Sequence, residues 1–164
     1  MKTHNISKKQ GMTLVELLVY LSITAIVLIV VIDLVTRVVQ NRSATYGQGE
    51  AVTNGRIFSD KLLYSVQNAS AINGSYPADS VSLTISGVAV TYALSGNQIF
   101  YNEGAGPIPL TTDRVEILPI NVGENIFSKV TNGSVNSIQA RFKVKFKENG
   151  YFQDFEISAL SRGK

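Results

Sequence analysis

A run of apolar residues near the N-terminus constrains this chain most. The 19 residues from Leu14 to Ile32 include 14 Leu, Ile or Val side chains, and the only charged residue among them is Glu16. A helix rising about 1.5 Å per residue covers about 28 Å with such a run, close to the hydrocarbon thickness of a bilayer. The apolar side chains favour insertion by about 4 to 8 kcal/mol, and one carboxylate opposes it by about 3 kcal/mol at most. The sequence therefore predicts a membrane-spanning helix.

The flanks of this run predict its orientation. Lys2, Lys8 and Lys9 precede it, and residues 1–11 contain no acidic residue. Because positive residues stay on the cytoplasmic side, we expect a single-pass protein of the cell inner membrane with its N-terminus in the cytoplasm and its C-terminal part translocated. No small-residue cleavage site follows the run, where an ordinary secretory signal would carry one. The residues expected to form the membrane helix include Leu14, Leu17, Leu18, Leu21, Ile23, Ile26, Val27, Ile29 and Val30.

A glycine lies on the other side of the run, between the basic residues and the apolar core. The segment KKQGMTLVELLVYL, from Lys8 to Leu21, resembles the class III signal of type IV prepilins and pseudopilins. The resemblance implies that prepilin peptidase cuts between Gly11 and Met12, so that residues 1–11 are a cleaved leader. It also implies that Met12 becomes the N-methylated first residue and that Glu16 takes the glutamate position of the family.

Glu16 has two explanations at this stage. A carboxylate in an apolar layer needs a partner, and in the family that partner is the new α-amine of a neighbouring subunit, here at Met12. The alternative is local. Met12 and Glu16 are four residues apart, so the amine of the same helix is within reach, and the helix dipole favours a glutamate in the first turn.

Composition narrows the possible chemistry. Without residues 1–11 the chain has 12 basic and 12 acidic residues, so its high isoelectric point comes from the leader and does not indicate a nucleic-acid partner. His4, the only histidine, also lies in the leader, and there is no cysteine. This excludes Cys or His catalytic sites, thiolate or imidazole metal sites, and disulfides. We expect a protein that is not an enzyme and that has no metal and no cofactor.

The remainder predicts an α+β fold, with a long N-terminal helix packed on an antiparallel β-sheet head. We divide the chain into the leader 1–11, a transmembrane or filament-core helix 12–39, an amphipathic helical continuation 40–72 and a sheet head 73–164. Gly47, Gly49 and Gly55 each weaken a helix by about 1 kcal/mol, which predicts a bend or a melted turn between Tyr46 and Gly55. A second helical pattern begins at Arg56 and reaches Ile72, before the turn that starts at Asn73. The expected strands are Val81–Ser86, Val88–Leu94, Gln98–Tyr101, Arg114–Ile120, Ser137–Lys147 and Tyr151–Leu160, with a loop at Gly104–Pro109 and a turn at Asn132 and Gly133.

The dipeptide Asn149-Gly150 predicts a tight two-residue hairpin between the last two strands. With that turn, one face of the hairpin is apolar and the other carries paired charges. The expected pairs are Glu148 with Tyr151, Lys145 with Asp154, Lys143 with Glu156, Val144 with Phe155, and Phe142 with Ile157.

The same hairpin carries a candidate nucleic-acid surface. Arg141, Lys143, Lys145 and Lys147 project on one side of a strand at intervals of about 6.8 Å, near the separation of alternate phosphates along one DNA strand. Carboxylates expected on the opposite strand argue for a solvated, charge-paired edge instead. DNA is therefore not the partner that the sequence favours.

The later strands, including VTYALSGNQIFY and QARFKVKF, resemble the layout of minor pilins and minor pseudopilins of the PilW, GspH and GspJ kind. Met12 replaces the phenylalanine usual in major pilins, and the kinking proline and the C-terminal cysteine pair of many of them are absent. The resemblance implies a filament subunit whose partners are other pilin or pseudopilin subunits, prepilin peptidase, an inner-membrane assembly platform and the lipid bilayer. The alternatives are a major pilin, a competence or adhesion pilin whose head binds DNA or a surface, and an anchored domain that is never cleaved at Gly11.

Overall fold

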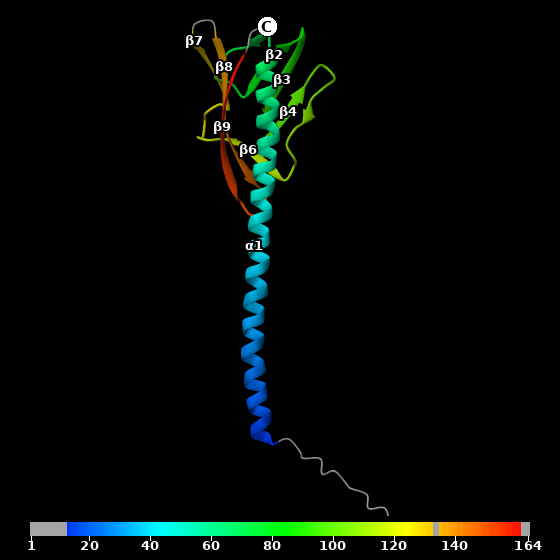
Figure 1. The fold of residues 1–164 in the computed structure, drawn as a ribbon, viewed down its shortest axis with the longest axis vertical. Coiled ribbons are helices and arrows are strands. Elements are labelled where there is room, and N and C mark those ends of the chain that lie inside the picture. The colour runs from blue at the N-terminus through cyan, green and yellow to red at the C-terminus, as the bar shows by residue number, and fades with distance from the viewer. Residues whose placement is uncertain (1–12, 133–134, 162–164) are drawn as a thin grey trace, which may run out of the picture. The chain divides into compact units, whose positions relative to one another are not determined.

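The fold is α+β, as the sequence predicts, with one long N-terminal helix and antiparallel sheets (Figure 1). The computed structural model describes residues 13–132 and 135–161. The chain forms two compact units, Met1–Arg42 and Ser43–Lys164. Helix α1 (Leu14–Asn68) contributes to both units, and the strands of the second unit follow it in chain order.

In the first unit the apolar part of α1 has no covering layer. Every described residue from Thr13 to Arg42 is exposed. Within the described ranges, α1 is the helix long and apolar enough to cross a membrane, with a mean hydropathy of 2.8 over its most apolar window and none of that window buried. Length and composition thus agree with the predicted membrane span.

The first sheet of the second unit has five antiparallel strands in the order β1-β2-β3-β4-β5. Three of them, β2, β3 and β4, were expected from the alternating pattern, whereas β5 lies inside a segment expected to be a loop. Tight turns with a positive backbone φ at Gly87 and at Asn97 join β2 to β3 and β3 to β4. The strands are β1 (Ala71–Asn73), β2 (Ser80–Ile85), β3 (Val88–Ser95), β4 (Gln98–Asn102) and β5 (Ile108–Pro109).

The second sheet is built around one long strand, β8, which pairs with three others. Strands β6 and β7 pair with successive parts of β8, and β9 pairs along most of its length. The strands are β6 (Val115–Pro119), β7 (Phe127–Asn132), β8 (Val135–Phe146) and β9 (Phe152–Leu160). The sequence reading missed β7, and the turn expected after Asn132 includes Gly133, which lies outside the described residues.

The C-terminal part of α1 holds the two sheets together. Phe58 is fully buried, and the centre of its ring lies 6.2 Å from that of Tyr92 on the first sheet. The same ring lies 6.2 Å from Phe127 and 4.9 Å from Phe142 on the second sheet. One helical face is therefore the centre of the hydrophobic core, and β2–β4 and β6–β9 lie on either side of it in Figure 1.

The sequence predicts a bend or a melted turn between Tyr46 and Gly55, and the melted turn is wrong, because α1 is helical throughout that segment. Gly47 and Gly55 are buried, and a Cβ on Gly55 would overlap the ring of Phe155. These two glycines permit close approach of the hairpin to the helix, and the packing gained outweighs their low helix propensity.

The predicted end of the helix is also wrong, since α1 ends at Asn68 and Ile72 lies in β1. The Asn68 side-chain amide donates to the Tyr64 carbonyl at 2.8 Å. The backbone N–H of Ser70 then donates to the Thr84 carbonyl at 2.8 Å, which starts the pairing of β1 with β2. A polar side chain that bonds to the last turn and a free neighbouring strand together end the helix early.

The predicted register of the last hairpin is displaced by two residues. The backbone N–H of Phe146 donates to the Tyr151 carbonyl at 2.7 Å, so four residues form the loop where two were expected. The side chain of Asn149 donates to the Ser43 carbonyl of α1 at 2.8 Å and accepts the Tyr151 N–H at 2.9 Å. The loop is therefore longer than the expected two-residue turn, and its Asn149 contacts the helix. The observed pairs include Arg141 with Glu156, Phe142 with Phe155, Lys143 with Asp154, Val144 with Gln153, and Lys145 with Phe152.

Candidate functional site

The first turn of α1 carries the residue with the clearest candidate role. The backbone N–H of Glu16 donates to Thr13 Oγ1 at 3.3 Å, and the N–H of Leu17 donates to the Thr13 carbonyl at 3.1 Å. Thr13 is therefore the N-cap, and Thr-x-x-Glu is the capping-box spacing. Sequence reasoning missed this signal, although both residues and their spacing were in view.

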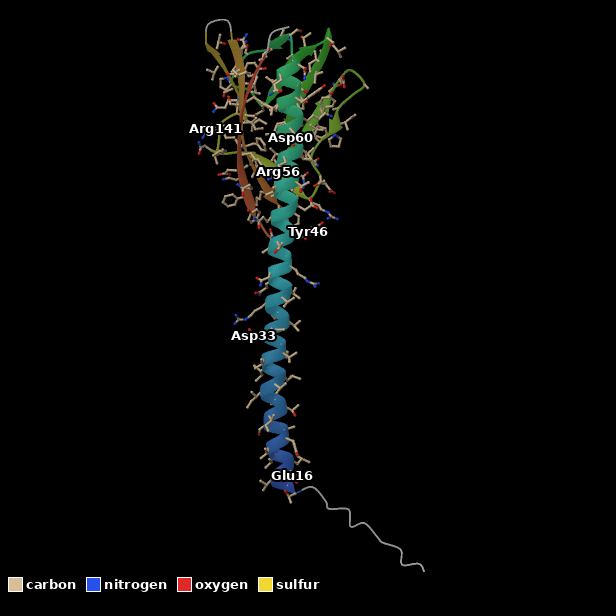
Figure 2. The ribbon with its side chains drawn as sticks, viewed as in Figure 1. Glu16, Asp33, Tyr46, Arg56, Asp60 and Arg141 are labelled. Atoms are coloured by element: carbon tan, nitrogen blue, oxygen red, sulfur yellow. The ribbon has the colours of Figure 1, made fainter. Side chains whose placement is uncertain are left out.

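Glu16 is exposed at the start of the helix (Figure 2), where the dipole favours a carboxylate. This supports the local explanation of its presence but leaves its charge free for a partner. The residues on which cleavage and methylation were placed, Gly11 and Met12, lie outside the described residues.

The predicted membrane residues lie on all sides of the helix and are open to their surroundings. Leu14 is 78% exposed, and even the least exposed of the set, Leu18, is 52% exposed. In water such a surface is unfavourable, so it requires lipid or another apolar helix around it.

Two hydroxyl side chains within the apolar run are bonded to backbone carbonyls of their own helix. Ser22 Oγ donates to the Leu18 carbonyl at 2.8 Å, and Thr24 Oγ1 donates to the Tyr20 carbonyl at 2.7 Å. A hydroxyl bonded to its own helix is tolerated in lipid, because no donor is left without a partner. These two residues therefore do not oppose the membrane span.

Beyond the apolar run, the first charges pair with each other. Arg37 Nε donates to Asp33 Oδ2 at 2.9 Å, four residues away on the same helix. Asp33 follows the 19-residue run Leu14–Ile32 directly and is labelled in Figure 2. This pair marks the end of the segment that can lie in hydrocarbon.

The candidate nucleic-acid row is only partly assembled, and its charges have partners. Arg141, Lys143 and Lys145 lie on β8, whereas Lys147 lies in the loop after it. Arg141 Nε is 3.8 Å from Glu156 Oε2, and Lys145 Nζ is 3.7 Å from Glu116 Oε2.

Lys143 has a different partner, the aromatic ring of Phe152, whose centre lies 4.7 Å from Lys143 Nζ. Its register neighbour on β9 is Asp154, where Glu156 was expected. The expected ion pairs of Lys143 and Lys145 with the last strand are therefore wrong. Arg141 pairs with Glu156 on β9, and Lys145 pairs with Glu116 on β6. Because the cations face carboxylates and a ring, the row is a poor phosphate-binding surface.

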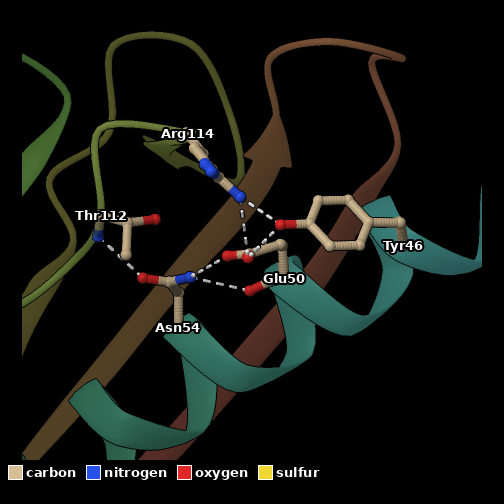
Figure 3. Close-up of polar contacts among 5 residues, drawn as sticks. All are labelled: Tyr46, Glu50, Asn54, Thr112 and Arg114. Carbon is tan, nitrogen blue, oxygen red and sulfur yellow. Dashed lines mark hydrogen bonds and ion pairs between the residues drawn. The ribbon is translucent and has the colours of Figure 1, made fainter. Parts of the chain in front are cut away.

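A polar cluster that the sequence did not reveal joins α1 to the loop before β6 (Figure 3). Tyr46 Oη donates to Glu50 Oε1 at 3.1 Å and accepts a hydrogen bond from Arg114 Nη1. Arg114 Nη1 also lies 3.7 Å from Glu50 Oε1. The hydrogen bond to Glu50 raises the pKa of the Tyr46 hydroxyl.

Asn54 connects the same cluster to the backbone of the loop. Its amide nitrogen donates to the Glu50 carbonyl at 2.9 Å, and its Oδ1 accepts the N–H of Thr112 at 2.8 Å. Asn54 is 2% exposed, so this is a buried polar bridge over 58 residues of sequence. The cluster holds the loop on the helix. Among the described residues, no three His, Cys, Asp or Glu side chains are grouped to hold a metal ion.

Comparison with known families gives one match. The family model of the prokaryotic N-terminal methylation motif matches residues 6–32, which contain Gly11, Met12, Glu16 and the apolar run. Neither the comparison with curated proteins nor that with solved structures gives a match. The matched motif supports a type IV pilin-like structural subunit that is processed by prepilin peptidase, anchored by its N-terminal helix and assembled with other pilin subunits.

Proposed function

We propose that this chain is a minor pilin or pseudopilin subunit of a type IV pilus or of a filament of the type II secretion kind. The observation that carries the proposal is the match at residues 6–32 to an N-terminal methylation motif, on a helix whose apolar segment is wholly exposed. The sequence supports a minor pilin rather than a major pilin. Met12 stands where major pilins usually have phenylalanine, and α1 contains no proline in its membrane segment.

In the proposed route, the chain first enters the inner membrane with its N-terminus in the cytoplasm. Prepilin peptidase then removes residues 1–11 by cutting between Gly11 and Met12, and Met12 is N-methylated. An assembly platform lifts the subunit into the filament. The apolar rod can leave lipid because the rods of neighbouring subunits give it an equally apolar surface.

Glu16 is the residue proposed to guide this step, by pairing with the α-amine at Met12 of a neighbouring subunit. Two charges that pair on entering an apolar layer avoid most of the penalty that either would have alone. Capping by Thr13 uses the backbone N–H of Glu16, so the carboxylate remains available for that pairing.

The competence or adhesion alternative has less support. Each cation of the β8 row that lies in the strand has a carboxylate or an aromatic ring beside it. Lipid and other subunits remain the proposed partners, and the chain is proposed as a component of the machine and not as a catalyst.

Two variants separate the pairing role of Glu16 from its capping role. Glu16→Gln removes the charge and keeps a residue that suits the third position of a capping box, whereas Thr13→Ala removes the cap and keeps the charge. We expect Glu16→Gln to be inserted and cleaved normally but to be lost from sheared filaments. Thr13→Ala, which costs the helix about 0.5 to 2 kcal/mol, should still be incorporated. Filaments that contain Glu16→Gln at the normal level would contradict the pairing role.

A further inference from the structure

A small cleft opens on the second sheet at the point where β8 changes partner. Strand β6 pairs with β8 from Phe142 onward and β7 pairs with it up to Ala140, so Arg141 lies between the two. The volume of the cleft is about 390 Å³, and sites for small molecules span about 300 to 1,000 Å³. We call it the loop cleft. Loop residues line it together with side chains of β7 and β8: Pro77, residues 123–126, Ser128, Gln139 and Arg141.

Arg141 supplies hydrogen-bond donors to the loop cleft. Its neighbours in the strand, Ala140 and Phe142, are buried in the core, so the Arg141 side chain points to the opposite face of the sheet, away from α1 (Figure 2). Within the described residues its guanidinium forms no hydrogen bond, since the 3.8 Å between its Nε and Glu156 Oε2 is too long for one. Glu156 thus orients the guanidinium, and its donors remain available to a ligand.

Gln139 and Glu124 supply acceptors, and each is held in place by a neighbour. Gln139 Nε2 donates to Glu156 Oε1 at 2.7 Å, which leaves Gln139 Oε1 as an acceptor. Glu124 Oε1 accepts from Asn121 Nδ2 at 2.9 Å, and the backbone N–H of Glu124 donates to the Asn121 carbonyl at 3.2 Å. The loop cleft therefore presents both donors and acceptors on side chains whose positions are already fixed.

The loop segments that form the walls are also fixed by hydrogen bonds. The backbone N–H of Ile126 donates to Asp79 Oδ1 at 3.2 Å. Ala78 and Phe127 exchange two backbone hydrogen bonds of 3.0 Å each, which hold the segment of Pro77 beside the start of β7. Because the walls are formed without a ligand, binding would require little reordering of the chain.

We propose that the loop cleft binds a neutral saccharide unit of one or two rings. Its hydroxyl oxygens accept hydrogen bonds from Arg141, and its hydroxyl groups donate to Gln139 Oε1 and to the carboxylate of Glu124. This binding activity goes beyond the proposed function and does not depend on it, because every residue of the loop cleft lies in the second unit, Ser43–Lys164.

The charges of the loop cleft select a neutral ligand. Glu124 lines it and Glu156 lies beside Arg141, so an anion would meet two carboxylates and only one guanidinium. A cation would meet Arg141. A hydroxyl group both donates and accepts, so a saccharide satisfies donors and acceptors without bringing a buried charge. The same balance of charge makes the neighbouring cations of β8 a poor surface for phosphate.

The position of the loop cleft on the sheet favours a saccharide over an extended peptide. A peptide that adds to a sheet bonds through backbone groups at a free strand edge. Ser128 and Gln139 are instead register partners inside the sheet, and they line the cleft from adjacent strands. A compact ligand that is read by side chains suits this place, and a rigid sugar ring loses little conformational freedom when it binds.

Saturation-transfer NMR tests the proposal on the full chain in phospholipid nanodiscs, which contain no sugar headgroup. The probes are glucose, galactose, mannose, N-acetylglucosamine, maltose and lactose, each also as its methyl glycoside, at about 10 mM so that millimolar affinities are detected. We expect transfer to at least one of them. Transfer to a methyl glycoside would indicate the end of a glycan chain as the source, and transfer to the free sugar alone would indicate a free sugar. No transfer to any probe would overturn the proposal.

Competition tests the chemistry of the ligand. Inorganic phosphate and the dipeptide glycylglycine, each at the same concentration as the bound sugar, should leave the transfer to that sugar unchanged. Displacement by phosphate would show an anion site, and displacement by glycylglycine would show a peptide site. Either displacement would overturn the assignment of a neutral saccharide.

Variants place the binding in the loop cleft. Arg141→Lys keeps the charge but removes the planar set of donors, and Asn125→Ala removes an exposed amide that lines the cleft, without touching the core. Each should raise the dissociation constant of the bound sugar severalfold while the circular dichroism spectrum stays unchanged. Arg56→Lys is the matched control, because Arg56 is exposed on α1 and does not line the cleft (Figure 2). It should bind the sugar as the parent does. Binding that neither Arg141→Lys nor Asn125→Ala weakens would overturn the proposed site.

Discussion

Two glycines of the same helix have opposite surroundings, which gives a matched pair of tests at the residue scale. A Cβ on Gly55 would overlap the Phe155 ring, which is stacked at 5.3 Å on Phe142 and cannot move without losing that contact. Around Gly49 nothing lies within 4 Å of such a Cβ.

We expect Gly55→Ala to lower the free energy of unfolding by about 1 to 3 kcal/mol, because the overlap exceeds the gain in helix propensity. Gly49→Ala should raise it by up to about 1 kcal/mol. Urea unfolding of the full chain in detergent, followed by circular dichroism, measures both. A Gly55→Ala variant as stable as Gly49→Ala would show that the hairpin does not pack on the helix as described.

Tyr101 is the second residue with a sharp expectation. Burial, together with the hydrogen bond that its hydroxyl donates to Glu103 at 2.6 Å, raises its pKa to about 12. In the unfolded chain the pKa is near 10, so between these values the folded state keeps a proton that the unfolded state has lost. The contribution of Tyr101 to stability is therefore complete below pH 10 and falls as the pH rises towards 12.

A spectroscopic titration of phenolate formation should show a tyrosine with a midpoint near pH 12 that disappears in Tyr101→Phe. The variant should also lose less stability than the parent over the same pH range. A titration curve that Tyr101→Phe leaves unchanged would contradict the raised pKa.

Some residue roles could be predicted from the sequence and others could not. The segment that contains Gly11, Met12 and Glu16 could be recognised because its motif depends on spacing along the chain, and a family model matches it at residues 6–32; the roles of the three residues stay predictions. The hydrogen bond between Asn54 and Thr112 joins residues that are 58 positions apart. No local sequence pattern indicates which asparagine will bind which loop, so this contact could not be predicted. The Thr13 cap, by contrast, depends on a local spacing, Thr-x-x-Glu, that the sequence contains.

At the scale of elements, the polar bridge between α1 and the loop before β6 should contribute measurably to stability. Asn54→Ala removes the acceptor of the Thr112 N–H, and because Thr112 is exposed water can take its place, so the expected cost is that of one ordinary hydrogen bond, about 0.5 to 1.5 kcal/mol. Asn68→Ala removes an exposed side-chain bond to the helix's own carbonyl and should cost less than about 0.5 kcal/mol. Thermal unfolding gives the melting temperature of each variant. Equal melting temperatures would show that the bridge does not contribute to the stability of the fold.

The strands were predicted well where a period of two and a turn signal coincide, as in β2, β3 and β4. The errors occurred where contact with the helix changed a local preference. Asn149 bonds to the Ser43 carbonyl of α1, and this contact sets a four-residue loop where Asn-Gly alone favours two. A shift of two residues keeps every side chain on its face, so the division into an apolar and a polar face was predicted correctly, whereas the cross-strand pairs were not.

The continuity of α1 has the same explanation. Glycines are poor helix formers in isolation, and a bend was the natural expectation for a segment that contains three of them. Two of the three are instead contact points, where the absence of a side chain lets the hairpin approach. Helix propensity is a weak preference, and tertiary packing overrode it here.

In the whole molecule, the two units differ in where their apolar side chains lie. The second has a cluster of buried apolar side chains around Phe58, whereas every apolar side chain that the structure describes in the first is exposed. The first unit therefore needs an apolar environment outside the chain, first lipid and then, in the proposed function, the rods of other subunits. In the proposed function residues 1–11 are removed, and the remaining chain has 12 basic and 12 acidic residues.

The proposed function requires cleavage after Gly11, which the intact mass of the protein from its native membrane or from sheared filaments can show. We expect a mass that lacks residues 1–11 and includes one added methyl group, with fragmentation placing the methyl on the amine of Met12. A mass that retains residues 1–11, with His4 still present, would show that the chain is not processed as a filament subunit.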